Sequence, residues 1–311
     1  MSSRGHPPVL IYETLHGSRA YGLAREGSDE DRKGIVVGPR AWYFGSRESP
    51  EQIEHSADHV HFEIRKFFRL AIANNPTILE ILFTEREDVR VVTAGGARLL
   101  ADRGLFLSKR VAGTFSGYAL SQLKRIQTHR RWLLHPPGKE PTRGDYGLPD
   151  RTVMPKDQLG AAQALLEKGE LREEDLSAPF LEILDRERRY RSARREWESF
   201  VKWKRERNPK RAELEARFGY DTKHAMHLVR LSTMAAEILE TGQVRVRRGD
   251  REELLAIRDG AFGYDALMEK VDALRLRTER ALSGSTLPDD PDEDALEALC
   301  VSIVGEILGC A

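Results

Sequence analysis

Short apolar runs separated by glycine breaks characterise the first hundred residues. Three of them have the length and β-branched content of strands, at residues 9–14, 31–37 and 59–64. From Ile64 the apolar residues recur at helical spacing, and Asn74-Asn75-Pro76 ends that segment. A second helix is predicted at 78–83, with Thr77 as its N-cap. Strands interleaved with helices predict a small α/β unit in this part of the chain.

Beyond residue 105 the apolar spacing is mainly helical. The predicted helices cover residues 115–132, 158–167, 181–218, 221–240, 251–258, 264–282 and 295–308. Pro209 is expected to break the longest of them. Residues 135–151 are rich in Pro and Gly and predict a loop, and 243–247 predicts a short extended run. The whole pattern indicates an α+β protein, with a small mixed-sheet domain at 1–105 and a mainly α-helical domain at 106–311.

Composition and charge narrow the function classes only a little. The chain has 50 acidic and 50 basic residues, so any binding to a polyanion requires a local patch. Its two cysteines, Cys300 and Cys310, lack metal-ligand spacing and are expected to be reduced thiols. No apolar run approaches the roughly 20 residues that span a bilayer, and the N-terminus lacks the apolar stretch of a signal peptide. We therefore expect a cytoplasmic protein with no membrane partner.

The segment GSRAYGLAREGSDED, at 17–31, combines two features that suit phosphate and metal chemistry. Gly17-Ser18 follows a predicted strand and precedes a helical turn, where outward-facing backbone N–H groups favour phosphate. Asp29 and Asp31 are two residues apart, so on a strand they face the same side. Two carboxylates directed at one point are costly without a cation, and Mg²⁺ prefers oxygen ligands. Either motif alone is ordinary loop composition; their combination at this spacing indicates function.

These residues resemble the nucleotidyltransferases of the DNA polymerase β superfamily, whose pattern is a Gly-Ser turn followed by Asp-x-Asp on the next strand. A longer resemblance, to a predicted bacterial and phage subgroup, covers HGSRAYGL, GSDEDRKGI, FEIRKFFRLAIANNPTILEILF and DTKHAMHLVRL. The resemblance implies that Asp29 and Asp31 hold Mg²⁺ or Mn²⁺, with two ions in all. It implies a third carboxylate on a later strand, best matched by Glu63 and alternatively by Asp58. Gly17 and Ser18 would then hold the phosphates of a nucleoside triphosphate.

A second polar cluster lies in the predicted helix at 221–240. Lys223, His227 and Arg230 recur at i, i+4 and i+7 and share one helix face, which suits a triphosphate. We predict that this helix forms one wall of the nucleotide site and that the helical domain closes over it. A solvated basic face is the alternative explanation. His224 and His227 together could also suggest a metal site, but no third ligand lies nearby in sequence.

The reaction type implied by the resemblance is transfer of a nucleotide from a nucleoside triphosphate to an acceptor. An RNA 3′ end, similar to that of tRNA, is the leading acceptor. A protein side chain or a small molecule is the variant, and the sequence does not separate them. A non-catalytic nucleotide-binding regulatory module is the alternative of a different class, against which the retained carboxylates argue.

Overall fold

The computed structural model describes residues 7–46, 48–151, 160–161, 164–166, 168–170, 172 and 176–310. The chain divides into two compact units. The first unit combines Met1–Gln127 with Tyr220–Ala311, and the second unit is Thr128–Gly219. This division is not the predicted boundary after residue 105, because the C-terminal helices belong to the same compact unit as the N-terminal elements, with α13 in contact with α3 and α5.

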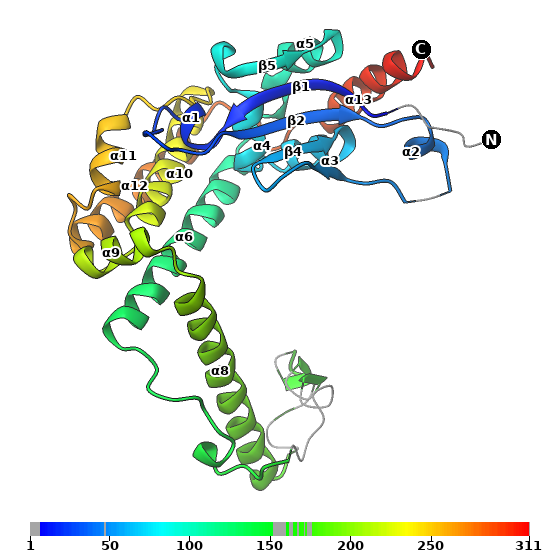
Figure 1. The fold of residues 1–311 in the computed structure, drawn as a ribbon. Helices are drawn as coiled ribbons and strands as arrows, with labels where there is room; N and C mark the ends of the chain where they lie inside the picture. Colours follow the sequence, from blue (N-terminus) through cyan, green and yellow to red (C-terminus); the bar gives the residue numbers. More distant parts are fainter. Residues whose placement is uncertain are drawn as a thin grey trace. The chain divides into compact units, whose positions relative to one another are not determined.

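A mixed sheet, five-stranded among the described residues, forms the centre of the first unit (Figure 1). Its strands are β1 (Val9–His16), β2 (Asp31–Val37), β3 (Gln52–Glu54), β4 (His59–Glu63) and β5 (Val89–Val92), in the order β3-β4-β2-β1-β5. Strands β2 and β4 are parallel, and the other neighbours are antiparallel. The three predicted strands are confirmed as β1, β2 and β4. Strands β3 and β5 were not predicted, because they are short and carry no fully buried residue.

Helices α3 (Ile64–Ile72) and α4 (Pro76–Leu82) pack against the sheet. The Tyr12 hydroxyl of β1 donates to the Ile81 carbonyl of α4 at 3.0 Å, which ties the two layers together. The apolar positions predicted for α3 are buried. The N-cap of α4 is Asn75 and not the predicted Thr77, because Pro76 already occupies the first turn and Asn75 accepts from the Ile78 N–H.

Shorter helices complete the N-terminal part of the first unit. They are α1 (Gly17–Ala20), α2 (Ala41–Phe44), η1 (Arg86–Asp88), α5 (Ala94–Ala101) and η2 (Arg103–Phe106), followed by the start of α6 (Arg110–Leu134). The predicted helix at 115–132 lies within α6, which continues into the second unit.

The C-terminal part adds α10 (Thr222–Thr241), α11 (Arg251–Arg258), α12 (Tyr264–Gly284) and α13 (Glu293–Leu308). Helix α10 lies beside α11 and α12, and α13 contacts α3 and α5. All four were predicted to within two residues at each end. The N-cap Asp221 accepts hydrogen bonds from two N–H groups of α10, and Gly242 ends the helix in the left-handed conformation. The run at 243–247 is irregular and pairs with no strand that the structure describes.

The second unit contains the end of α6, η3 (Gly144–Tyr146), α8 (Ala178–Glu206) and α9 (Pro209–Phe218). The predicted break is confirmed, with Pro209 as the first residue of α9, where its missing N–H costs nothing. Trp132, Phe200 and Trp203 form an aromatic cluster with ring centroids 5.4–5.9 Å apart. Of the helix predicted at 158–167, residues 160–161 and 164–166 are helical, and the rest lies outside the described residues.

The α+β class is therefore confirmed. Within the described part of the chain, no helix combines the length and the apolar character needed to cross a membrane.

Candidate active site

The glycine turn lies directly against the first strand carboxylate. Gly17 follows β1 and has φ +67°, in the left-handed region that disfavours other residues. A Cβ atom at this position would also overlap the carboxylate of Asp31. The register explains the contact, because His16 pairs with Asp31 across β1 and β2. Glycine is thus required twice, for its backbone conformation and for the space that Asp31 occupies.

Asp29 lies two residues before Asp31, in the exposed loop that leads into β2. Arg19 of α1 fixes this loop, since its guanidinium donates to the carbonyls of Ser28 at 3.0 Å and Asp29 at 3.3 Å. The loop is therefore tied to the glycine turn. Asp29 thus lies in the loop before β2 and not on the strand itself, where its spacing from Asp31 had predicted it.

The third carboxylate at this end of the sheet is Asp58. Strand β4 runs parallel to β2 with Arg32 opposite His59, so Asp58 precedes β4 where Asp31 begins β2. The Arg32 N–H donates to the Asp58 carbonyl at 2.7 Å, which holds the two chain segments together. Partial burial raises the pKa of Asp31, and the nearby charges of Asp58 and Asp29 raise it further, against His16 and Lys33.

Glu63, the first choice from the sequence for this role, lies at the opposite end of β4. It is opposite Val36, five residues beyond Asp31, or roughly 16 Å along the strand. Its buried carboxylate caps α3 by accepting from the Arg65 and Lys66 N–H groups, and Tyr43 donates to it at 3.0 Å. The structure therefore places Asp58, and not Glu63, at the end of the sheet that carries Asp29 and Asp31, and it uses Glu63 as a helix cap.

A buried polar network supports the glycine turn. Glu80 of α4, 2% exposed, accepts from the Tyr21 hydroxyl at 2.5 Å and pairs with His16 at 3.2 Å and with Arg230 of α10. The Arg230 guanidinium lies over the Tyr21 ring, 3.9 Å from its centroid. Although burial opposes ionisation, Arg230 and His16 lower the pKa of Glu80 to about 2. This network joins the turn, α4 and α10 into one rigid support.

The three predicted residues of α10 differ in their surroundings. Arg230 is buried and engaged by Glu80, so it does not face an open nucleotide site. Lys223 is exposed at the first turn, and His227 is partly buried between them. Burial, and then the charges of Arg230 and Lys223, lower the pKa of His227 to about 3, which keeps its imidazole neutral. His224 Nδ1 forms a hydrogen bond with Gln122 Oε1 at 2.7 Å.

The donor set at the strand ends fits divalent cations. No residue that the structure describes donates a side-chain hydrogen bond to the carboxylates of Asp29, Asp31 or Asp58. Burial is the main cause of the raised pKa of Asp31, and repulsion from the carboxylates of Asp58 and Asp29 adds to it. Hard oxygen-preferring ions such as Mg²⁺ relieve this repulsion and leave positions for phosphate oxygens.

Sequence reasoning missed Glu80, His16 and Tyr21 as parts of this site. The position of His16 and Tyr21 beside the Gly-Ser turn was a signal in the sequence that could have identified them. Glu80 had no such signal, because it lies within an apolar helix whose residues are predicted to be core. It also missed His55, His59 and His61, which form a close group together with Glu13. The alternation of His59 and His61 on one strand was the signal for that group.

Comparisons with known proteins concern the N-terminal region that carries this site. Residues 2–135 match the family model RlaP, described as the RNA repair pathway DNA polymerase beta family. The uncharacterized protein YcgL of Bacillus subtilis (strain 168) is 34% identical over 80 residues, which cover 24% of this chain and 31% of that protein. No solved structure gives a significant match. The family match supports a polymerase β-type nucleotidyltransferase over the N-terminal region, consistent with the resemblance in the sequence.

Proposed function

We propose that this protein is a metal-dependent nucleotidyltransferase that moves a nucleoside monophosphate from a nucleoside triphosphate to an RNA 3′ end. The observation that supports the proposal is the position of Asp31 against the Gly17 turn, with Asp29 before it in the chain and Asp58 at the same end of the neighbouring strand. The acceptor is inferred from the description of the matching family, which places it in an RNA repair pathway.

In this proposal Asp29, Asp31 and Asp58 hold two Mg²⁺ or Mn²⁺ ions. Bound ions would stabilise the entering and leaving oxygens of an in-line displacement at the α-phosphorus, with pyrophosphate as the leaving group. The carboxylates orient the reacting groups and hold the negative charge that fixes the ions. Asp58 replaces Glu63 as third ligand, because only Asp58 lies at the end of the sheet that carries Asp31.

The nucleotide is proposed to bind along the glycine turn and the first turns of α10. The backbone N–H groups at Gly17 and Ser18 would hold phosphate oxygens, since they lie at the turn that opens α1. Lys223, which is exposed in the first turn of α10, supplies a positive charge, and His227 supplies a neutral imidazole. Arg230 is proposed as a positioning residue that acts through Glu80 and Tyr21, because its guanidinium is buried and already paired.

The test is incubation of the full chain with each α-labelled nucleoside triphosphate, Mg²⁺ or Mn²⁺, and total RNA, followed by separation of RNA, protein and small molecules. We expect label on RNA. Asp31→Asn and Asp58→Asn should each lower the rate by roughly 10²–10³-fold, because each removes charge that stabilises the transition state. Far-ultraviolet circular dichroism checks that both variants remain folded.

Two control variants distinguish the loss of a proposed metal ligand from the loss of any carboxylate near the sheet. Glu63→Gln removes the competing carboxylate on the same strand, and Glu54→Gln removes an exposed carboxylate from the neighbouring strand β3. Both should retain activity within a few-fold of the unaltered protein. An active Asp58→Asn beside an inactive Glu63→Gln would contradict the assignment. Label on a protein or small molecule would replace RNA as acceptor, and nucleotide binding without transfer would favour a regulatory module.

A further inference from the structure

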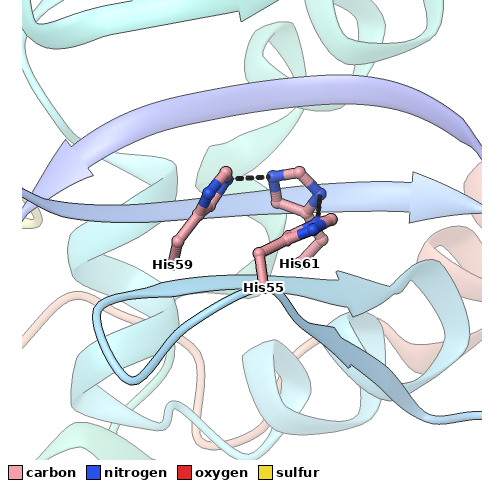
Figure 2. Close-up of side chains that lie close together, drawn as sticks. All are labelled: His55, His59 and His61. Carbon is pink, nitrogen blue, oxygen red and sulfur yellow. Dashed lines mark hydrogen bonds between the residues drawn. The ribbon is translucent and has the colours of Figure 1, made fainter.

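A second set of ligand-type side chains lies on the opposite face of the same sheet. Side chains alternate along a strand, so His59 and His61 of β4 point away from the face of Asp58. Figure 2 shows their imidazoles turned toward each other, with His55 of the β3–β4 hairpin completing the group. Glu13 of β1 reaches the same point from across β2, because Glu13, Gly34 and His61 are aligned in the register.

Three atoms of this cluster form a compact triangle. His59 Nε2 and His61 Nε2 are 3.0 Å apart, and they lie 2.9 Å and 2.7 Å from Glu13 Oε2. Glu13 and His61 are buried, whereas His59 is partly exposed, so the group is open to solvent on one side.

Hydrogen bonds cannot satisfy all three edges of this triangle. An imidazole nitrogen either donates one hydrogen or accepts one, and an ionised carboxylate only accepts. If both nitrogens donate to Glu13, two N–H groups face each other at 3.0 Å. If one nitrogen accepts, its lone pair faces the carboxylate oxygen. A cation above the triangle would satisfy all three lone pairs at once.

The dimensions suit Zn²⁺. Ligand distances of about 2.0–2.1 Å to His and carboxylate ligands in a tetrahedron place the ligand atoms about 3.3 Å apart. The observed separations of 2.7–3.0 Å therefore need to expand by only a few tenths of an ångström. Two imidazoles and one carboxylate are a donor set that zinc accepts while leaving a fourth position open.

Two further residues shape this group. A Cβ at Gly34 would lie 2.7 Å from His61 Cδ2, so glycine leaves the space in which the imidazole lies across β2. His55 Nε2 is 3.1 Å from His61 Nδ1 (Figure 2). A partner on the second nitrogen fixes the tautomer and orientation of a metal-binding histidine.

We propose that Glu13, His59 and His61 bind one Zn²⁺ ion, with His55 as the residue that orients His61. The site is distinct from the carboxylate group, because it lies on the other face of the sheet and uses imidazole nitrogens. The ion would tie the β3–β4 hairpin to β1. Since Asp58 belongs to that hairpin, the ion also fixes Asp58; this last consequence alone rests on the proposed function.

The test is a Zn²⁺ titration of the full chain after treatment with a chelator, in competition with a chromophoric indicator. We expect one tight equivalent, and Co²⁺ in its place should give the visible absorption of a tetrahedral site. His59→Gln and His61→Gln should each lower the affinity for Zn²⁺ at least tenfold, and His55→Ala should lower it roughly tenfold. Hydrogen exchange should show Zn²⁺-dependent protection of residues 55–61 in the unaltered protein alone.

Two controls separate this site from the rest of the molecule. His135→Ala removes an exposed histidine of the second unit and should leave Zn²⁺ affinity unchanged. Asp31→Asn should also leave it unchanged, whether or not the chain transfers nucleotides. Because His61 is buried, the partly exposed His59 gives the decisive variant if His61→Gln fails to fold. Equal Zn²⁺ affinity in the unaltered protein and in folded His59→Gln would overturn the proposal.

Discussion

The two faces of the sheet at β2 and β4 carry different metal-ligand types: carboxylates on one face and mainly imidazoles on the other. Asp58 and His59 are adjacent in sequence, yet the first belongs to a carboxylate group and the second to an imidazole group. The carboxylate face offers only hard oxygen ligands, whereas the histidine face mixes nitrogen with one oxygen. Successive side chains of a strand alternate between the two faces of a sheet. One pair of strands can therefore offer oxygen ligands suited to Mg²⁺ on one face and imidazole ligands suited to Zn²⁺ on the other.

The two faces also differ in what supports them. The carboxylate face depends on the buried Glu80–Arg230 pair, which connects the glycine turn to α10. The histidine face depends on the absence of a side chain at Gly34. Substitutions that remove one support should therefore affect one face and leave the other intact.

The largest effect is expected from Arg230→Met, which keeps an unbranched apolar stem in place of the arginine stem but removes the charged guanidinium. Breaking a buried ion pair leaves Glu80 partly uncompensated and should lower the free energy of unfolding by about 3–5 kcal/mol. Urea denaturation measures this loss. Adding Glu80→Gln to the same chain should recover part of it, because the unpaired charge is then gone. A free energy of unfolding for Arg230→Met alone within 1 kcal/mol of that of the unaltered protein would show that the ion pair contributes little to stability. Zn²⁺ binding by the folded fraction should persist.

Gly34→Ala should have a smaller effect, directed at the histidine face. The added Cβ would lie 2.7 Å from both His61 Cδ2 and the Tyr12 carbonyl oxygen. Overpacking of this kind costs about 1–3 kcal/mol in the free energy of unfolding, and the displaced imidazole should weaken Zn²⁺ binding. Gly113→Ala is the matched control, because the space around Gly113 in α6 is open. Comparable losses in the two variants would mean that contact with His61 is unimportant.

The last effect is a pH dependence, to which His227 on the carboxylate side and His61 on the histidine face both contribute, because burial lowers the pKa of each imidazole. The pKa of His227 is lowered to about 3, so between this value and about 6.5 the unfolded chain binds a proton that the folded chain does not. Stability should therefore fall as the pH drops below about 6.5, by up to about 1.4 kcal/mol per pH unit from this residue. His227→Gln should flatten the curve of unfolding free energy between pH 6.5 and 5. Parallel curves for the two proteins would refute this contribution.

Much of the fold could be predicted from the sequence, because its elements have clear local signals. Strand β2 and helix α11 were predicted to the residue, and the positions of Gly17 and Asp31 followed from local spacing. The short strands β3 and β5 could not be predicted, since their pairing comes from neighbours distant in sequence. The predicted boundary after residue 105 stays a prediction; the compact units divide the chain elsewhere, because local periodicity does not reveal which helices return to the first unit.

The third carboxylate shows what kind of information the sequence lacks. Asp58 and Glu63 flank the same strand, one at each end, and both are acidic. The direction of β4 decides between them, because a strand parallel to β2 places Asp58 beside Asp31, whereas an antiparallel strand would have placed Glu63 there. Strand direction is a long-range property. Burial is another, since helical spacing grouped Arg230 with Lys223 without showing that Arg230 is enclosed.

The second unit interrupts the first one in the chain, and its two ends meet, since the Arg130 side chain donates to the Gly219 carbonyl at 3.0 Å. This arrangement has a consequence for biosynthesis. A ribosome that has released residues 1–219 has completed the whole sheet and the inserted unit, but not the helices that enclose Glu80. The nascent chain must therefore extend through α10, which carries Arg230, before the buried charge of Glu80 is matched, and proteolysis or chaperone binding would act during that interval.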